Sequence, residues 1–258
     1  MTRTALVTGS VGGLGLAIAE CLAAAGYRVA LNGLAPQDEG ERIAGELAQR
    51  HDIHTEYFGA DLSRRDRIEA LVSTIEERLG AIDVLVNNAV VRHFAPVDTF
   101  DPDSWQRALD VNLTAPFHLA RLLIAGMKDR GWGRIVNIAS YYGYRGAENR
   151  IDYVTTKTAL LGMTRALAIE CAKSGITANA VCPGSVGTEA ILGRIRGMAD
   201  ETGADFERLA ESYAAERNPM GRFVAAESVG AMVAFLCSDA GRDISGAIIP
   251  VDGGWLAR

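Results

Sequence analysis

The chain has 258 residues, 48% hydrophobic and 22% charged, and at ~150 residues per domain this length allows one or two domains. Lys and Arg number 26 against 32 Asp and Glu, and the resulting net charge of −6 disfavours nucleic acid as a partner, because a phosphate backbone needs a basic face. No apolar run approaches the ~20 residues of a membrane helix and no signal-peptide pattern is present, so we expect a cytoplasmic protein without membrane contact.

Short β-branched and aliphatic runs alternate with helix-period stretches along the chain. The predicted strands are residues 5–7, 28–31, 53–58, 82–86, 133–139, 176–181 and 247–251. The predicted amphipathic helices include residues 38–50, 64–79, 102–130 and 152–174. Strands that are apolar throughout need burial on both faces, as in a parallel sheet covered by helices. We therefore predict a doubly wound α/β fold of about seven strands, with residues 1–258 as a single domain.

A glycine-rich segment, Thr8–Gly15, follows the first predicted strand and leads into a good helix former. Glycines allow a tight turn and a close approach to a pyrophosphate, whose charge is met by the free N–H groups of the helix. This position favours a dinucleotide-binding turn, and a purely structural turn is the alternative.

Tyr153 and Lys157 lie four residues apart on a predicted helix, so both side chains share one face. A cation beside a phenol favours the phenolate, which can act as a base. Ser140 follows a predicted strand, where its hydroxyl can bond a reacting oxygen. Of the 26 basic residues only Lys128, Lys157 and Lys173 are lysines. Because the sequence otherwise uses Arg, the Lys at position 157 favours a specific role over a surface charge. We predict an acid/base set; a surface pair and a turn-forming Ser are the alternatives.

Residues 189–217 interrupt the alternation after the Pro183-Gly184 turn and are helical in character. Ligands in such folds bind outside the carboxyl ends of the strands, so we predict a substrate lid here. A surface helical pair is the alternative. The four Cys and four His form no ligand spacing, which predicts structural thiols and no metal.

Several motifs together resemble the short-chain dehydrogenase/reductase family, whose members have a Rossmann-type fold. In chain order they are Thr8-Gly9-x-x-x-Gly13-x-Gly15, Asp61, Asn87-Asn88-Ala89, Asn112, Ser140, Tyr153-x-x-x-Lys157, Pro183-Gly184 and Thr188. The resemblance implies a nicotinamide cofactor bound by Gly9, Gly13, Leu14, Gly15, Asn32, Asp61, Leu62, Asn88, Ala89, Tyr153, Lys157, Pro183, Gly184, Val186 and Thr188. It also implies a homotetramer.

The resemblance further implies a role for each catalytic residue. Tyr153 would exchange a proton with the substrate alcohol and Ser140 would orient that alcohol. Lys157 would bind the nicotinamide ribose, and Asn112 would support a water-linked proton path. In the cofactor site, Asp61 would contact the adenine, Asn88 the adenosine ribose region and Thr188 the carboxamide.

The choice between NAD and NADP is left open by the motifs. The second strand ends Leu31-Asn32-Gly33-Leu34, without an acidic residue for a ribose hydroxyl. No cation lies between residues 30 and 41 to pair with a 2′-phosphate, which favours NAD. Val90 stands where the family usually has Gly.

Within the family the chain resembles bacterial D-3-hydroxybutyrate dehydrogenases. Those enzymes hold a small carboxylate with Gln, His, Lys and Gln, whereas the matching residues here are Arg92, Tyr142, Arg150 and Arg194. Arg is a planar, bidentate partner for oxyanions, so we expect a larger or more acidic anion. Arg150 and Arg194 also match an arginine pair that holds a sulfonate in hydroxyalkyl-thioethanesulfonate dehydrogenases. Simple surface exposure of these arginines is the alternative.

The sequence therefore predicts an NAD-dependent oxidoreductase that interconverts a secondary alcohol or sugar hemiacetal and a carbonyl or lactone. Its small anionic substrate is a hydroxy carboxylate or a hydroxy or sugar sulfonate. One alternative is a non-catalytic dinucleotide-binding regulator, because fold alone does not give function. A 3-oxoacyl reductase-like enzyme using NADP is another.

Overall fold

The computed structural model describes residues 2–258, and its seven strands form one parallel sheet in the order β3-β2-β1-β4-β5-β6-β7. The strands are β1 (Thr4–Val7), β2 (Arg28–Gly33), β3 (Thr55–Gly59), β4 (Ile82–Asn87), β5 (Gly133–Ile138), β6 (Ile176–Pro183) and β7 (Ile248–Val251). The strand order reverses between β1 and β4, where doubly wound sheets open a crevice at their carboxyl ends. The predicted Rossmann-type fold is confirmed.

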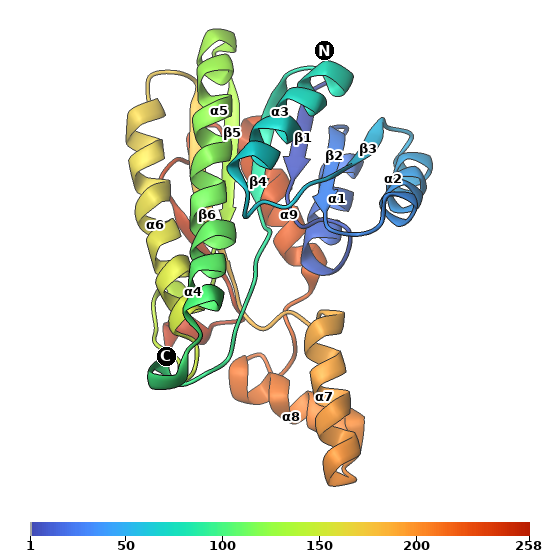
Figure 1. Ribbon diagram of the computed structural model, residues 1–258, viewed down its shortest axis with the longest axis vertical. Helices are drawn as coiled ribbons and strands as arrows, with labels where there is room; N and C mark the ends of the chain where they lie inside the picture. The colour runs from blue at the N-terminus through green and yellow to red at the C-terminus, as the bar shows by residue number, and fades with distance from the viewer. Residues whose placement is uncertain (1) are drawn as a thin grey trace.

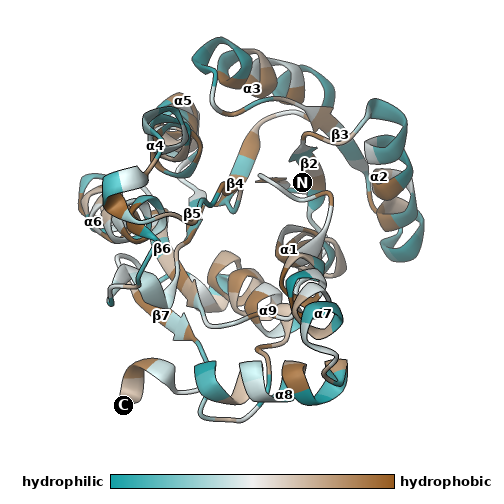
Figure 2. Cartoon of the chain, turned by 60° about the horizontal axis from the view of Figure 1, so that its bottom comes forward, coloured by the Kyte–Doolittle hydropathy of each residue, from teal (hydrophilic) through white to brown (hydrophobic). Residues whose placement is uncertain are grey.

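Helices cover both faces of this sheet (Figure 1). They are α1 (Gly13–Ala24), α2 (Gln37–His51), α3 (Arg65–Leu79), α4 (Pro102–Leu109), α5 (Ala115–Arg130), α6 (Ile151–Cys171), α7 (Glu189–Thr202), α8 (Phe206–Arg217) and α9 (Ala226–Cys237). One core cluster joins the sheet to α1, α2 and α9, and a second joins it to α3, α5 and α6. The outer turns of α2 and α3 are hydrophilic, as expected of helices with one buried face (Figure 2).

Alternate residues of each central strand enter opposite cores. In β1, Leu6 packs toward α3 and α5 while Val7 packs toward α1 and α9, and both are fully buried. Full burial of such a side chain contributes ~1.5–3 kcal/mol. The absence of polar alternation in the predicted strands thus follows from two buried faces. Burial on both faces also holds the carboxyl ends of β1, β4, β5 and β6 in place around the crevice.

Residues 102–130 do not form the single helix that the sequence predicts. They divide into α4 and α5, joined by a π-helical turn over Asp110–Thr114. Pro116 has no N–H to donate to the carbonyl of Asn112, so a regular α-helical hydrogen bond is lost at this point. Widened turns of this kind often occur at functional sites, and this one carries Asn112.

Residues 189–217 form two helices, α7 and α8, that extend beyond the carboxyl ends of the strands (Figure 1). Across residues 2–258, no helix is long and apolar enough to cross a membrane. The same residues contain no group of three or more His, Cys, Asp or Glu arranged to hold a metal ion.

Candidate active site

The glycine-rich segment forms the turn between β1 and α1. Gly9 and Gly13 have φ of 60° and 53°, a conformation that side chains rarely adopt. A Cβ on Gly15 would lie 2.1 Å from the carbonyl oxygen of Gly9 and 2.6 Å from the Asn88 side chain, so only Gly fits there. Asn88 Nδ2 donates to the carbonyls of Thr8 and Gly9, both at 2.9 Å. The turn therefore presents its N–H groups, with the N-terminus of α1, to the crevice.

A cavity of about 290 Å³ opens in front of this turn. Most residues expected at a dinucleotide line it: Gly9, Gly13, Leu14, Gly15, Asn88, Ala89, Tyr153, Lys157, Pro183, Gly184, Val186 and Thr188. Asn32, Asp61 and Leu62 are not among its lining residues. Asn32 is buried and donates to the carbonyls of Phe58 and Ala60, and Leu62 packs in the core between the sheet and α3.

The residues of this cavity fit a nicotinamide dinucleotide. The first N–H groups of the twelve-residue helix α1 have no intrahelical partner, so they can bind a pyrophosphate. Ser140, Tyr153 and Lys157 line the same cavity as this turn. One cavity thus combines an anion-binding turn for the pyrophosphate with polar side chains for the reacting group.

Ser140 follows β5 and Tyr153 lies in the first turn of α6, so both border the crevice. Ser140 is 4% exposed and its Oγ accepts a hydrogen bond from the Tyr142 N–H at 3.2 Å. The Tyr153 ring is 9% exposed and packs edge-on against the Tyr142 ring, with centroids 6.1 Å apart. Ser140 and Tyr153 thus line the same two cavities although they come from different elements.

Lys157 lies on the predicted face of α6, with its Nζ 5.7 Å from the centre of the Tyr153 ring. The ammonium donates to the carbonyl of Ile138 at 2.6 Å and the residue is only 2% exposed. Burial, with a smaller contribution from the Arg92 charge, lowers the pKa of Lys157 to about 7. The Ile138 carbonyl therefore fixes the lysine beside the tyrosine before any ligand is present.

Asn112 is buried and its side chain bonds the loop after β4 and helix α6. Its Oδ1 accepts from the N–H of Val91 at 2.9 Å, and its Nδ2 donates to the Val91 carbonyl at 2.9 Å and to Thr156 Oγ1 at 3.3 Å. The π-helical turn aims the side chain at this loop. In the structure, Asn112 therefore ties the loop after β4 to α6.

A second cavity, of about 380 Å³, adjoins Ser140 and Tyr153. All four predicted substrate residues, Arg92, Tyr142, Arg150 and Arg194, line it together. Arg217 of α8 lines it too and was missed by sequence reasoning, because only the packing of α8 brings that residue to the crevice. Of residues 2–258, no Asp or Glu is part of this lining. The cavity therefore presents positive charge to any occupant.

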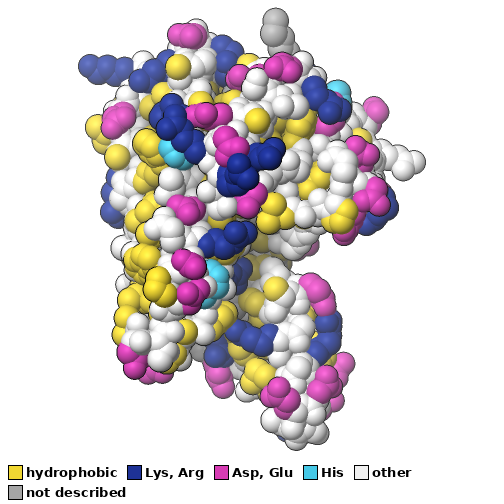
Figure 3. Space-filling view, viewed as in Figure 1, with side chains coloured by type: hydrophobic (Ala, Val, Ile, Leu, Met, Phe, Trp, Pro, Cys, Tyr) yellow, Lys and Arg dark blue, Asp and Glu magenta, His cyan; other side chains and the backbone are white. Residues whose placement is uncertain are grey.

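Aromatic rings hold several of these guanidinium groups. The Cζ of Arg150 lies 4.0 Å from the centre of the Phe94 ring, that of Arg194 lies 5.5 Å from the Tyr213 ring, and that of Arg217 lies 3.8 Å from it. Arg150 Nη1 is buried without a hydrogen-bond partner among the described residues. Figure 3 shows basic side chains on both sides of the hollow between α7 and the rest of the molecule. Arg194 also donates to the Tyr213 hydroxyl, and Arg217 pairs with Glu216, so Arg150 is the stacked guanidinium with a buried N–H group free for an oxyanion.

Comparisons with known proteins agree with this arrangement. A family model described as enoyl-(acyl carrier protein) reductase matches residues 9–256. The D-beta-hydroxybutyrate dehydrogenase of Cupriavidus necator is 39% identical, covering 99% of this chain and 98% of that protein. The enzyme of the same name from Rhizobium meliloti is 36% identical over the whole of both chains. The crystal structure of L-sorbose reductase from Gluconobacter frateurii with NADPH and L-sorbose is 29% identical, with a TM-score of 0.96 over 100% of this chain and 97% of that one.

Proposed function

The chain belongs to the short-chain dehydrogenase/reductase family and is an oxidoreductase, and from that premise we propose that it acts on a small anionic substrate. It interconverts a secondary alcohol, or a sugar hemiacetal, and the corresponding carbonyl or lactone. The arginine-lined cavity beside Ser140 and Tyr153 is the observation that carries this proposal. A cavity with several guanidinium groups and no lining carboxylate among the described residues favours an anion.

The chain's own residues supply binding and proton transfer. Ser140 Oγ donates to the substrate oxygen and orients it toward Tyr153. The Tyr153 phenolate takes the alcohol proton during oxidation, and the Tyr153 hydroxyl gives a proton to the carbonyl oxygen during reduction. Lys157 stands beside this phenol and favours its ionised form when charged. The nicotinamide, when bound, accepts or donates the hydride.

We propose NAD as the cofactor. The end of β2 offers no cation to a 2′-phosphate, because no Arg or Lys lies between Arg28 and Arg42. The Arg42 guanidinium is bonded to Glu46 on the same helix, which reduces its availability. NADP binding with comparable affinity would contradict this choice.

The substrate is a hydroxy carboxylate, or a hydroxy or sugar sulfonate. Both classes present a planar or tripodal oxyanion that Arg150 and Arg194 can bind with paired N–H groups. The cavity of about 380 Å³ is within the size range of small-ligand sites. By the resemblance, Arg92 and Arg194 stand where neutral Gln binds a short carboxylate, and Arg150 stands where Lys does. Two added charges support a larger or more strongly acidic group.

Nicotinamide absorbance tests the proposal directly. Purified protein is mixed with NAD or NADP and with 3-hydroxybutyrate, hydroxyalkyl sulfonates, sulfonated sugars, aldonic acids and neutral alcohols. We expect turnover of one anionic class with NAD and its loss in Tyr153→Phe. This variant keeps the ring and removes the hydroxyl, so it separates catalysis from packing.

Two other outcomes have distinct meanings. Binding of dinucleotide without turnover of any compound would favour a non-catalytic regulator. Turnover of 3-oxoacyl thioesters with NADPH would favour the 3-oxoacyl reductase alternative. We also propose a homotetramer and a lid formed by α7 and α8; light scattering and ligand-dependent hydrogen exchange of residues 189–217 test these two proposals.

A further inference from the structure

A buried carboxylate beside the catalytic tyrosine has no part in the reaction described above. Asp152 is the second residue of α6 and precedes Tyr153, and its side chain is completely buried. A buried carboxylate is costly unless its oxygens are hydrogen-bonded. Its partners therefore show what it does.

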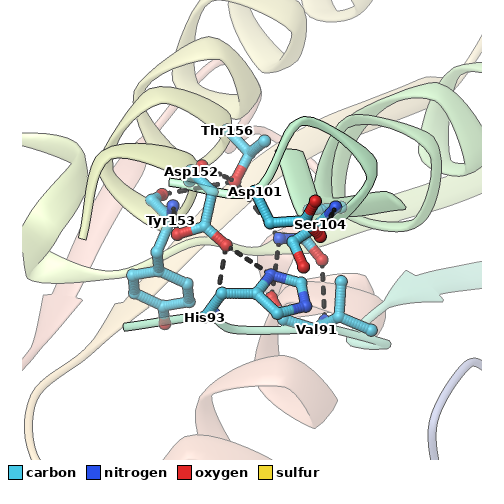
Figure 4. A network of polar contacts seen from close by, with 8 residues as sticks. Val91, His93, Asp101, Ser104, Asp152, Tyr153 and Thr156 are labelled. Carbon is cyan, nitrogen blue, oxygen red and sulfur yellow. Dashed lines mark hydrogen bonds and ion pairs between the residues drawn. The ribbon is translucent and has the colours of Figure 1, made fainter. Parts of the chain in front are cut away.

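Asp152 joins two different elements. Its Oδ2 accepts hydrogen bonds from the N–H of His93 at 3.1 Å and from the His93 ring Nδ1 at 3.0 Å. Its Oδ1 accepts from the N–H of Tyr153 at 2.6 Å. Figure 4 shows His93 and Asp152 pointing toward one another between the loop after β4 and the start of α6. The carboxylate thus ties this loop to the turn that carries the catalytic tyrosine.

The same loop carries Arg92, which lines both cavities. Asn112 holds the loop at Val91 through two hydrogen bonds, and Asp152 holds it at His93. Arg92 lies between these two points, with its Cζ 5.5 Å from the centre of the Tyr153 ring. An arginine fixed on both sides keeps its place relative to the tyrosine hydroxyl.

A helix-capping role alone does not account for these contacts. An acid in the first turn of a helix is favourable because of the N–H groups there, and the bond to Tyr153 N–H serves that purpose. The two bonds to His93 add nothing to the helix. Asp205 shows the difference, because its carboxylate accepts from the Arg208 N–H in the first turn of its own helix, α8.

We propose that Asp152, acting with His93, is a positioning residue that holds Arg92 in register with the Tyr153 hydroxyl. This inference rests on the proposed function, because it takes Arg92, which lines the arginine cavity, as one of the groups that bind the substrate anion. The pair sets the distance between the anion-binding group and the proton-transferring group. It therefore governs which alcohol carbon of an anionic substrate meets Tyr153.

Asp152→Asn removes this arrangement with little change in volume. A carboxylate can accept from His93 and Tyr153 at the same time, whereas an amide has one accepting oxygen. Either orientation of the amide leaves its NH₂ group facing a backbone N–H. The matched control is Asp205→Asn, which makes the same change at the start of α8, where the carboxylate bonds its own helix and not the loop.

Hydrogen exchange of the free protein is the first readout, because it needs no substrate. We expect faster exchange of residues 88–97 in Asp152→Asn than in the wild type or in Asp205→Asn. Unchanged exchange in this loop would overturn the proposal. If Asp152→Asn does not fold, His93→Ala provides the same comparison, since it removes the ring contact and leaves the carboxylate bonded to backbone.

A double-mutant cycle is the second readout. With NAD and 3-hydroxybutyrate, or the hydroxyalkyl sulfonate or sulfonated sugar that the wild type turns over, Asp152→Asn should lower kcat/KM ~10-fold. The loss should be less than ~2-fold in an Arg92→Ala background, because Asp152 acts on the substrate through Arg92. Turnover of the neutral butan-2-ol should change less than ~2-fold. Equal losses in both backgrounds, or for both alcohols, would assign Asp152 a purely structural role and overturn the inference. Absence of wild-type turnover would instead count against the proposed function and leave the exchange result to decide.

Discussion

Arg150 is the residue whose surroundings argue most directly for an anionic ligand. Its guanidinium stacks on Phe94 and faces the rings of Tyr142 and Tyr153, while its Nη1 is buried without a partner among residues 2–258. A donor buried in this way costs free energy until an acceptor binds it. The family resemblance predicted Arg150 for the substrate site, but only the fold shows that Phe94 orients the guanidinium.

Arg150→Ala should therefore raise the KM for the anionic substrate ~10- to 100-fold, because a hydrogen bond to a charged group contributes ~1.5–3 kcal/mol. The KM for a neutral alcohol should change little. Arg145→Ala is the control, since Arg145 is exposed and lies in the same loop outside this cavity. Steady-state kinetics with both alcohols measure the effect, and equal changes in both KM values would rule out an anion site at Arg150.

Lys157 predicts a pH dependence of stability. Its pKa is lowered from 10.5 to about 7 by burial, so between these values the unfolded chain binds more protons than the folded one. The free energy of unfolding should then rise with pH from this group. Between pH ~7 and ~9 the rise should be on the order of 1–2 kcal/mol, and it should be absent in Lys157→Met. Urea unfolding at several pH values measures it; parallel pH profiles for the two proteins would contradict a buried lysine.

At the scale of elements, apolar runs and glycine turns allowed most of the fold to be predicted. Each predicted strand overlaps an observed one. A continuous apolar run indicates a strand buried on both faces whichever side chains pack against it. The division of residues 102–130 was not predicted, although Pro116 marks in the sequence the point where an α-helical hydrogen bond is lost. That the widened turn brings Asn112 to Val91 depends on a contact between distant residues. Asn32 likewise lies outside the cofactor cavity because its amide bonds the carbonyl of Phe58 on the neighbouring strand.

The tight turn between β1 and α1 leaves no room for a side chain at Gly15. In Gly15→Ala the new methyl group would meet the Gly9 carbonyl at 2.1 Å, so α1 must shift away from β1. We expect the free energy of unfolding to fall by ~1–3 kcal/mol and dinucleotide binding to weaken. Gly45→Ala in α2 is the control, because nothing lies within 4 Å of its added Cβ and Ala favours a helix interior. Equal effects of the two substitutions on denaturant unfolding would show that the turn is not crowded.

The whole molecule combines a net charge of −6 with a cavity lined by arginines. Such a protein repels an anion at long range and attracts it only near the cavity, where the positive charge is concentrated. Added NaCl screens this short-range attraction, so kcat/KM for the anionic substrate should fall with salt while that for a neutral alcohol stays constant. At equal ionic strength, sulfate should inhibit more strongly than chloride and compete with the substrate, because its oxygens match the paired N–H groups of arginine. Equal inhibition by both salts, or equal salt effects on both alcohols, would mean that the arginines act only as surface charge. Competition by sulfate that is lost in Arg150→Ala would place the oxyanion at that guanidinium.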